Sequence, residues 1–160
     1  MSNNQVSPLS KTIGLGIVSG MRSAFGPAFA SYYVNKHPSE KLRNSPLKWM
    51  QKDATMRYLQ TMAAGELVVD KASWVGNRTS APGLTGRIMA GALAGATIYQ
   101  AKGGKSWKGA IIGAIAATAA TFLFFHLRKY ADRKLPVKDR TIGGLEDALA
   151  VGVATLLTRK

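Results

Sequence analysis

Residues 109–127 read GAIIGAIAATAATFLFFHL. This run of 19 residues carries no charged side chain. A helix needs about 20 consecutive apolar residues to cross the hydrocarbon core of a bilayer. The run therefore predicts a membrane-spanning helix, and it is the strongest such signal in the chain.

A second long apolar stretch lies near the start of the chain, at residues 12–34. Between Lys11 and Lys36, Arg22 is the only charged residue among 24. Proline in a helix interior removes a hydrogen bond and clashes with the preceding turn, so Pro27 is expected to kink or break this helix near Gly26. Weaker helical signals follow at 87–101 and 141–158.

Residues 59–74 are harder to interpret, because only eight uncharged residues separate Arg57 from Glu66. Counted as a full span, this stretch gives five crossings. Counted as re-entrant, it gives four. The sequence thus predicts an all-α integral membrane bundle of four or five transmembrane helices, with a short interfacial amphipathic helix at 45–58.

The chain of 160 residues fits a single domain, 1–160, that begins with a polar tail at 1–11. Its formal net charge is +14, and the cations gather in basic segments at 36–57 and 128–140. Charge placed in loops between uncharged runs is typical of a membrane protein, whereas nucleic-acid-binding domains more often spread it over amphipathic elements. We expect anionic lipid headgroups at these segments and no nucleic acid, and the positive-inside rule favours the four-crossing count, with both segments on one side.

Five charged residues are candidates for positions at membrane depth, where charge is costly and is usually paired. They are Arg22, Glu66, Asp70, Glu146 and Asp147. Glu66 and Asp70 are four residues apart and share a helix face. Because a guanidinium can bind a carboxylate through two donors, we expect Arg22 to pack against Glu66 or Asp70. Glu146 and Asp147 could instead simply favour the N-terminal dipole of the last helix.

Glycines recur at a spacing of four residues, which allows helix backbones to approach closely in lipid. The pairs are Gly16 and Gly20, Gly91 and Gly95, and Gly109 and Gly113. This spacing serves packing within one chain and between chains alike. A homo-oligomer is therefore possible, and the spacing does not decide the oligomeric state.

The two halves of the chain share a faint pattern of a glycine-and-arginine helix followed by an acidic helix. GLGIVSGMR near the start is echoed by GLTGR, and AGELVVDK is echoed by GGLEDALA. Arg87 then corresponds to Arg22, and Glu146 or Asp147 to Glu66. Internal repeats are common in small transport proteins, whose site lies at the repeat interface.

Four stretches together resemble the small bacterial membrane proteins classified as the domain of unknown function numbered 4126. They are GLGIVSGMRSAFGPA (14–28), AAGELVVDK (63–71), NRTSAPGLTGRIMAGALAGA (77–96) and LEDALAVG (145–152). The resemblance implies a helical, multi-pass protein of the bacterial cytoplasmic membrane. It carries no activity, and no functional residues.

Two functions fit these features: a transporter or channel-like protein for an ion or small polar solute, or a structural or accessory membrane subunit in which the buried charges are packing ties. An enzyme is not expected, because none of the common catalytic or phosphate-binding motifs is present. There is no cysteine, the two histidines lie far apart, and no metal or cofactor is expected. A soluble basic protein is the third alternative.

Overall fold

The computed structural model describes residues 7–69, 81–134 and 139–159. Its elements are α1 (Pro8–Met21), α2 (Phe25–Lys36), α3 (Glu40–Arg43), the 3-10 helix η1 (Pro46–Gln51), α4 (Asp53–Val69), α5 (Ala81–Ala101), α6 (Ser106–Lys134) and α7 (Asp139–Thr158). Every regular element of the described residues is helical, which confirms the predicted all-α class.

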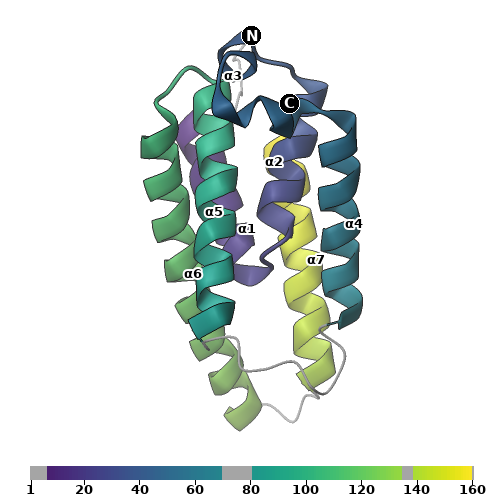
Figure 1. The fold of residues 1–160 in the computed structure, drawn as a ribbon. Coiled ribbons are helices and arrows are strands. Elements are labelled where there is room, and N and C mark those ends of the chain that lie inside the picture. Colours follow the sequence, from purple (N-terminus) through teal and green to yellow (C-terminus); the bar gives the residue numbers. More distant parts are fainter. Residues whose placement is uncertain (1–6, 70–80, 135–138, 160) are drawn as a thin grey trace, which may run out of the picture.

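The first predicted span is two helices rather than one. The chain leaves α1 after Met21, turns at residues 22–24, and returns as α2 toward the end at which it began (Figure 1). The ammonium group of Lys11, at the start of α1, lies 3.9 Å from the ring centroid of Tyr33, near the end of α2. α1 and α2 thus form an antiparallel hairpin whose tip lies inside the bundle.

The chain therefore breaks a few residues before the predicted position near Gly26. Pro27 is the third residue of α2, where its missing N–H has no intrahelical partner to lose. The turn instead occurs at Arg22, whose extended backbone, with φ −140° and ψ 115°, ends α1.

Four long helices pack around the hairpin: α4, α5, α6 and α7, of which α6 is the longest (Figure 1). The element expected to be re-entrant, 59–74, is in its described part the continuous C-terminal portion of α4. The chain reverses inside the bundle at the α1–α2 hairpin instead.

The predicted amphipathic helix at 45–58 is also divided. Ser45 caps η1 by accepting from the amide of Leu47 at 3.1 Å, and Pro46 occupies the first turn, as expected for these residues. η1 then ends at Gln51, and α4 begins at Asp53. Residues 53–58 thus belong to a long bundle helix.

The basic segments lie at opposite ends of the bundle, which contradicts the predicted arrangement on one side. The segment 36–57 joins α2 to α4 at the end near the N- and C-termini (Figure 1). Residues 128–134, expected as a loop, are the last turns of α6 at the other end. α5 likewise begins at Ala81, six residues before the predicted start.

α6 packs against both α5 and α1, and these contacts are the most extensive in the bundle. A Cβ on Gly91 would come 2.6 Å from the carbonyl oxygen of Gly113, and one on Gly16 would come 2.7 Å from the same oxygen. Gly95 and Gly109 are in equally close backbone contact. Glycines of three helices thus meet within one chain, with Gly20 packed beside Ala117 and Ala120 of α6.

Candidate functional site

The hairpin tip interrupts the backbone inside the bundle and leaves polar groups to be satisfied there. The first amides of a helix have no partner within that helix. α2 begins after Ala24, whose side chain cannot act as a cap. The amides at the tip therefore need an acceptor from elsewhere in the fold.

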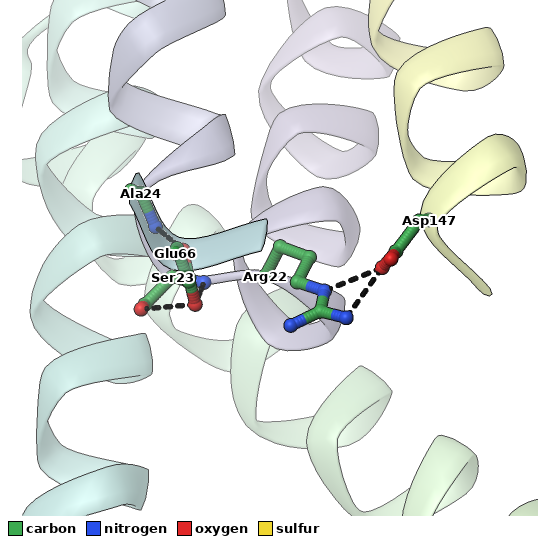
Figure 2. A network of polar contacts seen from close by, with 5 residues as sticks. All are labelled: Arg22, Ser23, Ala24, Glu66 and Asp147. Carbon is green, nitrogen blue, oxygen red and sulfur yellow. Dashed lines mark hydrogen bonds and ion pairs between the residues drawn. The ribbon is translucent and has the colours of Figure 1, made fainter. Parts of the chain in front are cut away.

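Glu66 of α4 supplies that acceptor. Its Oε1 accepts from the amide of Ser23 at 2.9 Å and from the Ser23 hydroxyl at 2.8 Å. Its Oε2 accepts from the amide of Ala24 at 2.7 Å. A carboxylate at this position also meets the positive end of the α2 dipole. Glu66 thus caps α2 from another helix (Figure 2).

Arg22 makes the second set of contacts at the tip. Its Nε donates to Oδ1 of Asp147 at 2.6 Å, and its second terminal nitrogen lies 2.5 Å from the same oxygen. The side chain of Arg22 is only 4% exposed and that of Asp147 is 19% exposed. Charge-assisted contacts of this kind are among the stronger hydrogen bonds in proteins. The tip is therefore held by one carboxylate from α4 and one from α7 (Figure 2).

Three of the predicted network residues meet at the tip, but with a different pairing. Arg22 contacts Asp147, while Glu66 contacts Ser23 and Ala24 rather than Arg22. Asp147 is the ninth residue of α7, so it lies well beyond the first turn, where the helix dipole acts. Its contact with Arg22 explains the carboxylate instead.

The other predicted network residues are not part of this described set of contacts. Asp70 lies outside the described residues, and so does the side chain of Glu146 in α7. Arg87 is buried on α5, 7% exposed. Arg22 and Arg87, which correspond to each other in the pattern shared by the two halves of the chain, are thus both buried. Arg22 lies at the hairpin tip and Arg87 on a long helix.

Sequence reasoning missed the role of Ser23 and Ala24, because their contribution is mainly backbone N–H groups exposed by a turn. It also missed a polar cluster at the end of the bundle that carries α3. There Lys11, 2% exposed, and Lys102 approach the ring of Tyr33, with ammonium-to-centroid distances of 3.9 and 5.4 Å. The His37 ring lies 4.9 Å from that of Tyr33.

The electrostatics of this cluster act on the phenol of Tyr33, which lies in the last turn of α2. Burial alone would raise the pKa of Tyr33. The nearby ammonium groups of Lys102 and Lys11 outweigh burial, and the pKa of Tyr33 lies below the ordinary value of 10.0. The cluster is therefore a region of positive potential.

Of the described helices, one contains a stretch that is long and apolar enough to cross a membrane by length and composition, Ser106–Tyr130 within α6. Only 28% of its most apolar part is buried inside the protein. The helix thus turns most of its apolar surface outward.

Comparison with curated proteins and with solved structures gives no match. A family model does match, over residues 9–159, which include both helices of the hairpin, Glu66 and Asp147. The chain belongs to the family described as the domain of unknown function DUF4126.

Proposed function

We propose that the protein is a multi-pass membrane protein in which α4, α5, α6 and α7 cross the bilayer and the α1–α2 hairpin enters it from one side. With a rise of about 1.5 Å per residue, a helix of about 20 residues covers the roughly 30 Å of a hydrocarbon core. The bilayer expected from the family resemblance is the bacterial cytoplasmic membrane.

The distribution of side chains supports a lipid environment. Large apolar residues are exposed on α4, α5, α6 and α7, with Val68 72%, Met89 66%, Ile115 65% and Leu145 67% exposed. The fully buried positions include Thr12, Ser19, Ser31 and Thr97. Single exposed apolar residues also occur on soluble proteins, but helices that face lipid expose large apolar side chains by necessity.

Within that fold, we propose that the hairpin tip is a polar site for an ion or a small polar solute, which makes the protein transporter-like or channel-like. The observation that carries this proposal is the break at residues 22–24. Irregular backbone at membrane depth is tolerated only where protein buries it or where it lines a water-filled cavity. Transporters place their sites at such broken helices, near the middle of the bilayer.

A structural or accessory subunit is the second candidate, and one observation favours it. The carboxylate of Glu66 accepts three hydrogen bonds, and Asp147 contacts Arg22 through two nitrogens. A site whose charges are this well matched can fix helix register without carrying a solute.

Thiol accessibility distinguishes the two candidates, since the chain has no cysteine of its own. Ala24→Cys places a thiol at the tip and keeps the backbone amide that Glu66 binds. Lys48→Cys, at an exposed position of η1, is the control for full water access, and Ile115→Cys, on the apolar face of α6, is the control for a lipid-facing position.

In intact membranes, a membrane-impermeant thiol reagent should label Ala24→Cys almost as fast as Lys48→Cys if a water-filled route reaches the tip. Protection of Ala24→Cys would overturn the transport proposal and favour the structural role. Rapid labelling of Ile115→Cys would contradict the bilayer arrangement itself.

A further inference from the structure

The C-terminal half of α6 carries an open groove of about 510 Å³. Its lining is formed by Leu123, His126, Leu127, Lys129 and Tyr130. Positions 123, 126, 127 and 130 follow helical spacing and therefore share one face of the helix. The volume falls within the roughly 300–1,000 Å³ of small-molecule sites. At this end of the bundle α6 reaches beyond the first turn of α5 (Figure 1).

The groove combines an apolar part with a polar part. Leu123 and Leu127 supply aliphatic surface, and both are at least half exposed. Lys129 adds an exposed positive charge. His126 adds an exposed imidazole, whose ring meets that of Phe125 edge-on with centroids 5.6 Å apart. None of the described side chains that line the groove is acidic. A matching ligand therefore joins an apolar chain to an anionic group.

The groove lies near one end of the apolar part of α6. Trp107 near the start of α6 and Tyr130 near its end are both exposed. These residue types favour the interface between membrane and water. With a rise of about 1.5 Å per residue, the helix from Trp107 to Tyr130 covers about 35 Å, slightly more than the roughly 30 Å of a hydrocarbon core. In the proposed bilayer arrangement, the two leucines of the groove thus lie at acyl-chain depth and Lys129 at headgroup depth.

The helix dipole does not account for Lys129. Cations are favourable in the last turn of a helix, and the effect falls off within that turn. Arg133 and Lys134 hold the positions of the last turn of α6, whereas Lys129 comes more than a turn before its end. The neighbouring Arg128 is directed toward α7, because its guanidinium lies 3.8 Å from the place of a Cβ on Gly143. Lys129 is the cation that lines the groove.

We infer that the groove binds one anionic phospholipid, with the lipid phosphate at Lys129 and an acyl chain along Leu123 and Leu127. A lysine ammonium group binds phosphate as a point charge. The ring N–H of His126 and the hydroxyl of Tyr130 are donors for other phosphate oxygens. The positive lining favours a headgroup with net negative charge over a zwitterionic one, and the leucines favour a lipid over free phosphate. The inference rests on the proposed bilayer arrangement, but not on solute passage at the hairpin tip.

Native mass spectrometry of the purified full-length chain in detergent measures how many lipids stay bound at each lipid concentration. Phosphatidylglycerol is the probe, and phosphatidylcholine with the same acyl chains is the control. We expect one phosphatidylglycerol to bind at concentrations roughly tenfold lower than phosphatidylcholine requires, as for the gain of one charge-assisted contact. Phosphatidylglycerol with a photoreactive acyl chain should label the peptide that contains residues 123–130.

Lys129→Gln removes the positive charge at an exposed position, so it should leave the fold intact and weaken phosphatidylglycerol binding by roughly tenfold. Lys108→Gln is the matched control and should leave binding unchanged. Lys108 is also exposed on α6 and lies beside an aromatic ring, with its ammonium group 5.6 Å from the ring centroid of Trp107, but it is outside the groove.

Equal binding of the two lipids would overturn the inference. So would equal losses in Lys129→Gln and Lys108→Gln, because the effect would then reflect the overall charge of +14 rather than a site. Photolabelling spread evenly over the helices, or a dimer in which a second copy covers residues 123–130, would contradict it as well. Slow labelling of Ile115→Cys together with no preference for phosphatidylglycerol would mean that the bilayer arrangement holds and that this inference alone fails.

Discussion

The Nε of Arg22 donates to Oδ1 of Asp147 at 2.6 Å, although 125 residues separate the two in the sequence. This contact joins the tip of the α1–α2 hairpin to the middle of α7. Glu66 joins the same tip to α4. Two helices that are distant in sequence are thus tied through a turn of three residues.

Removing the carboxylate from this contact should destabilise the bundle. Asp147→Asn removes the negative charge that the buried guanidinium of Arg22 contacts, and breaking a buried pair on one side costs about 3–5 kcal/mol. We expect the lower end of that range, since the Asp147 side chain is 19% exposed. Denaturant unfolding in detergent measures the change.

Lys41→Ala, at an exposed position of α3, is the control and should change stability by less than about 0.5 kcal/mol. Replacing both partners, as Arg22→Met with Asp147→Leu, should recover much of the loss. If Asp147→Asn were no worse than Lys41→Ala, the ion pair would not contribute to the fold.

The cap on α2 should be sensitive to loss of the Glu66 carboxylate. Glu66→Ala removes every acceptor for the amides of Ser23 and Ala24, and loss of a helix N-cap costs about 1–2 kcal/mol. Glu66→Gln keeps one oxygen and should have a smaller effect. Hydrogen exchange at residues 23–28 should speed up in the order wild type, Glu66→Gln, Glu66→Ala.

Leu67→Ala, at the next and partly buried position of α4, serves as the comparison. It should lower global stability through lost packing without selectively exposing the Ser23 and Ala24 amides. Unchanged exchange in Glu66→Ala would show that the cap is dispensable.

Much of the helical content could be predicted because it depends on local pattern. The apolar run at 109–127 lies within α6, and 141–158 lies within α7. The residues Arg22, Glu66 and Asp147 could also be selected, because charge within an apolar helix requires a partner. Composition and spacing sufficed for these features.

The hairpin could not be predicted, because its cause is not local. The stretch 12–34 is apolar enough to be predicted as one helix. Pro27 predicts a break near Gly26, whereas the chain reverses at Arg22. The reversal at Arg22 is stabilised by Glu66, 43 residues away from Ser23 in the sequence, and by Asp147. The sequence likewise predicts that Lys11 belongs to a polar tail, whereas the structure buries it through contacts with α2 and the turn after α5.

The glycine contacts between α5 and α6 should tolerate no side chain at the point of closest approach. In Gly113→Ala the new methyl group would overlap the carbonyl oxygen of Gly91, so the two backbones must separate. Overpacking of this kind costs about 1–3 kcal/mol. Thermal unfolding of the purified protein measures the loss.

Gly152→Ala in α7 is the matched control, because a Cβ there would meet no atom within 4 Å. Alanine favours the helix over glycine by up to about 1 kcal/mol, so this variant should be neutral or slightly more stable. Equal effects of the two substitutions would mean that helix propensity, and not close packing, decides the outcome at Gly113.

The lowered pKa of Tyr33 links stability to pH with a defined sign. The folded protein favours the ionised phenol more than the unfolded chain does. The resulting stabilisation is present above the ordinary pKa of 10.0 and is lost as pH falls through the lower pKa of the folded state. Wild type should therefore gain stability relative to Tyr33→Phe as pH rises through that interval, in denaturant unfolding at a series of pH values. Tyr58→Phe, which changes a tyrosine that is 65% exposed on α4, should show no such gap. A difference between wild type and Tyr33→Phe that stays constant across the interval would mean that Lys11 and Lys102 do not favour the phenolate.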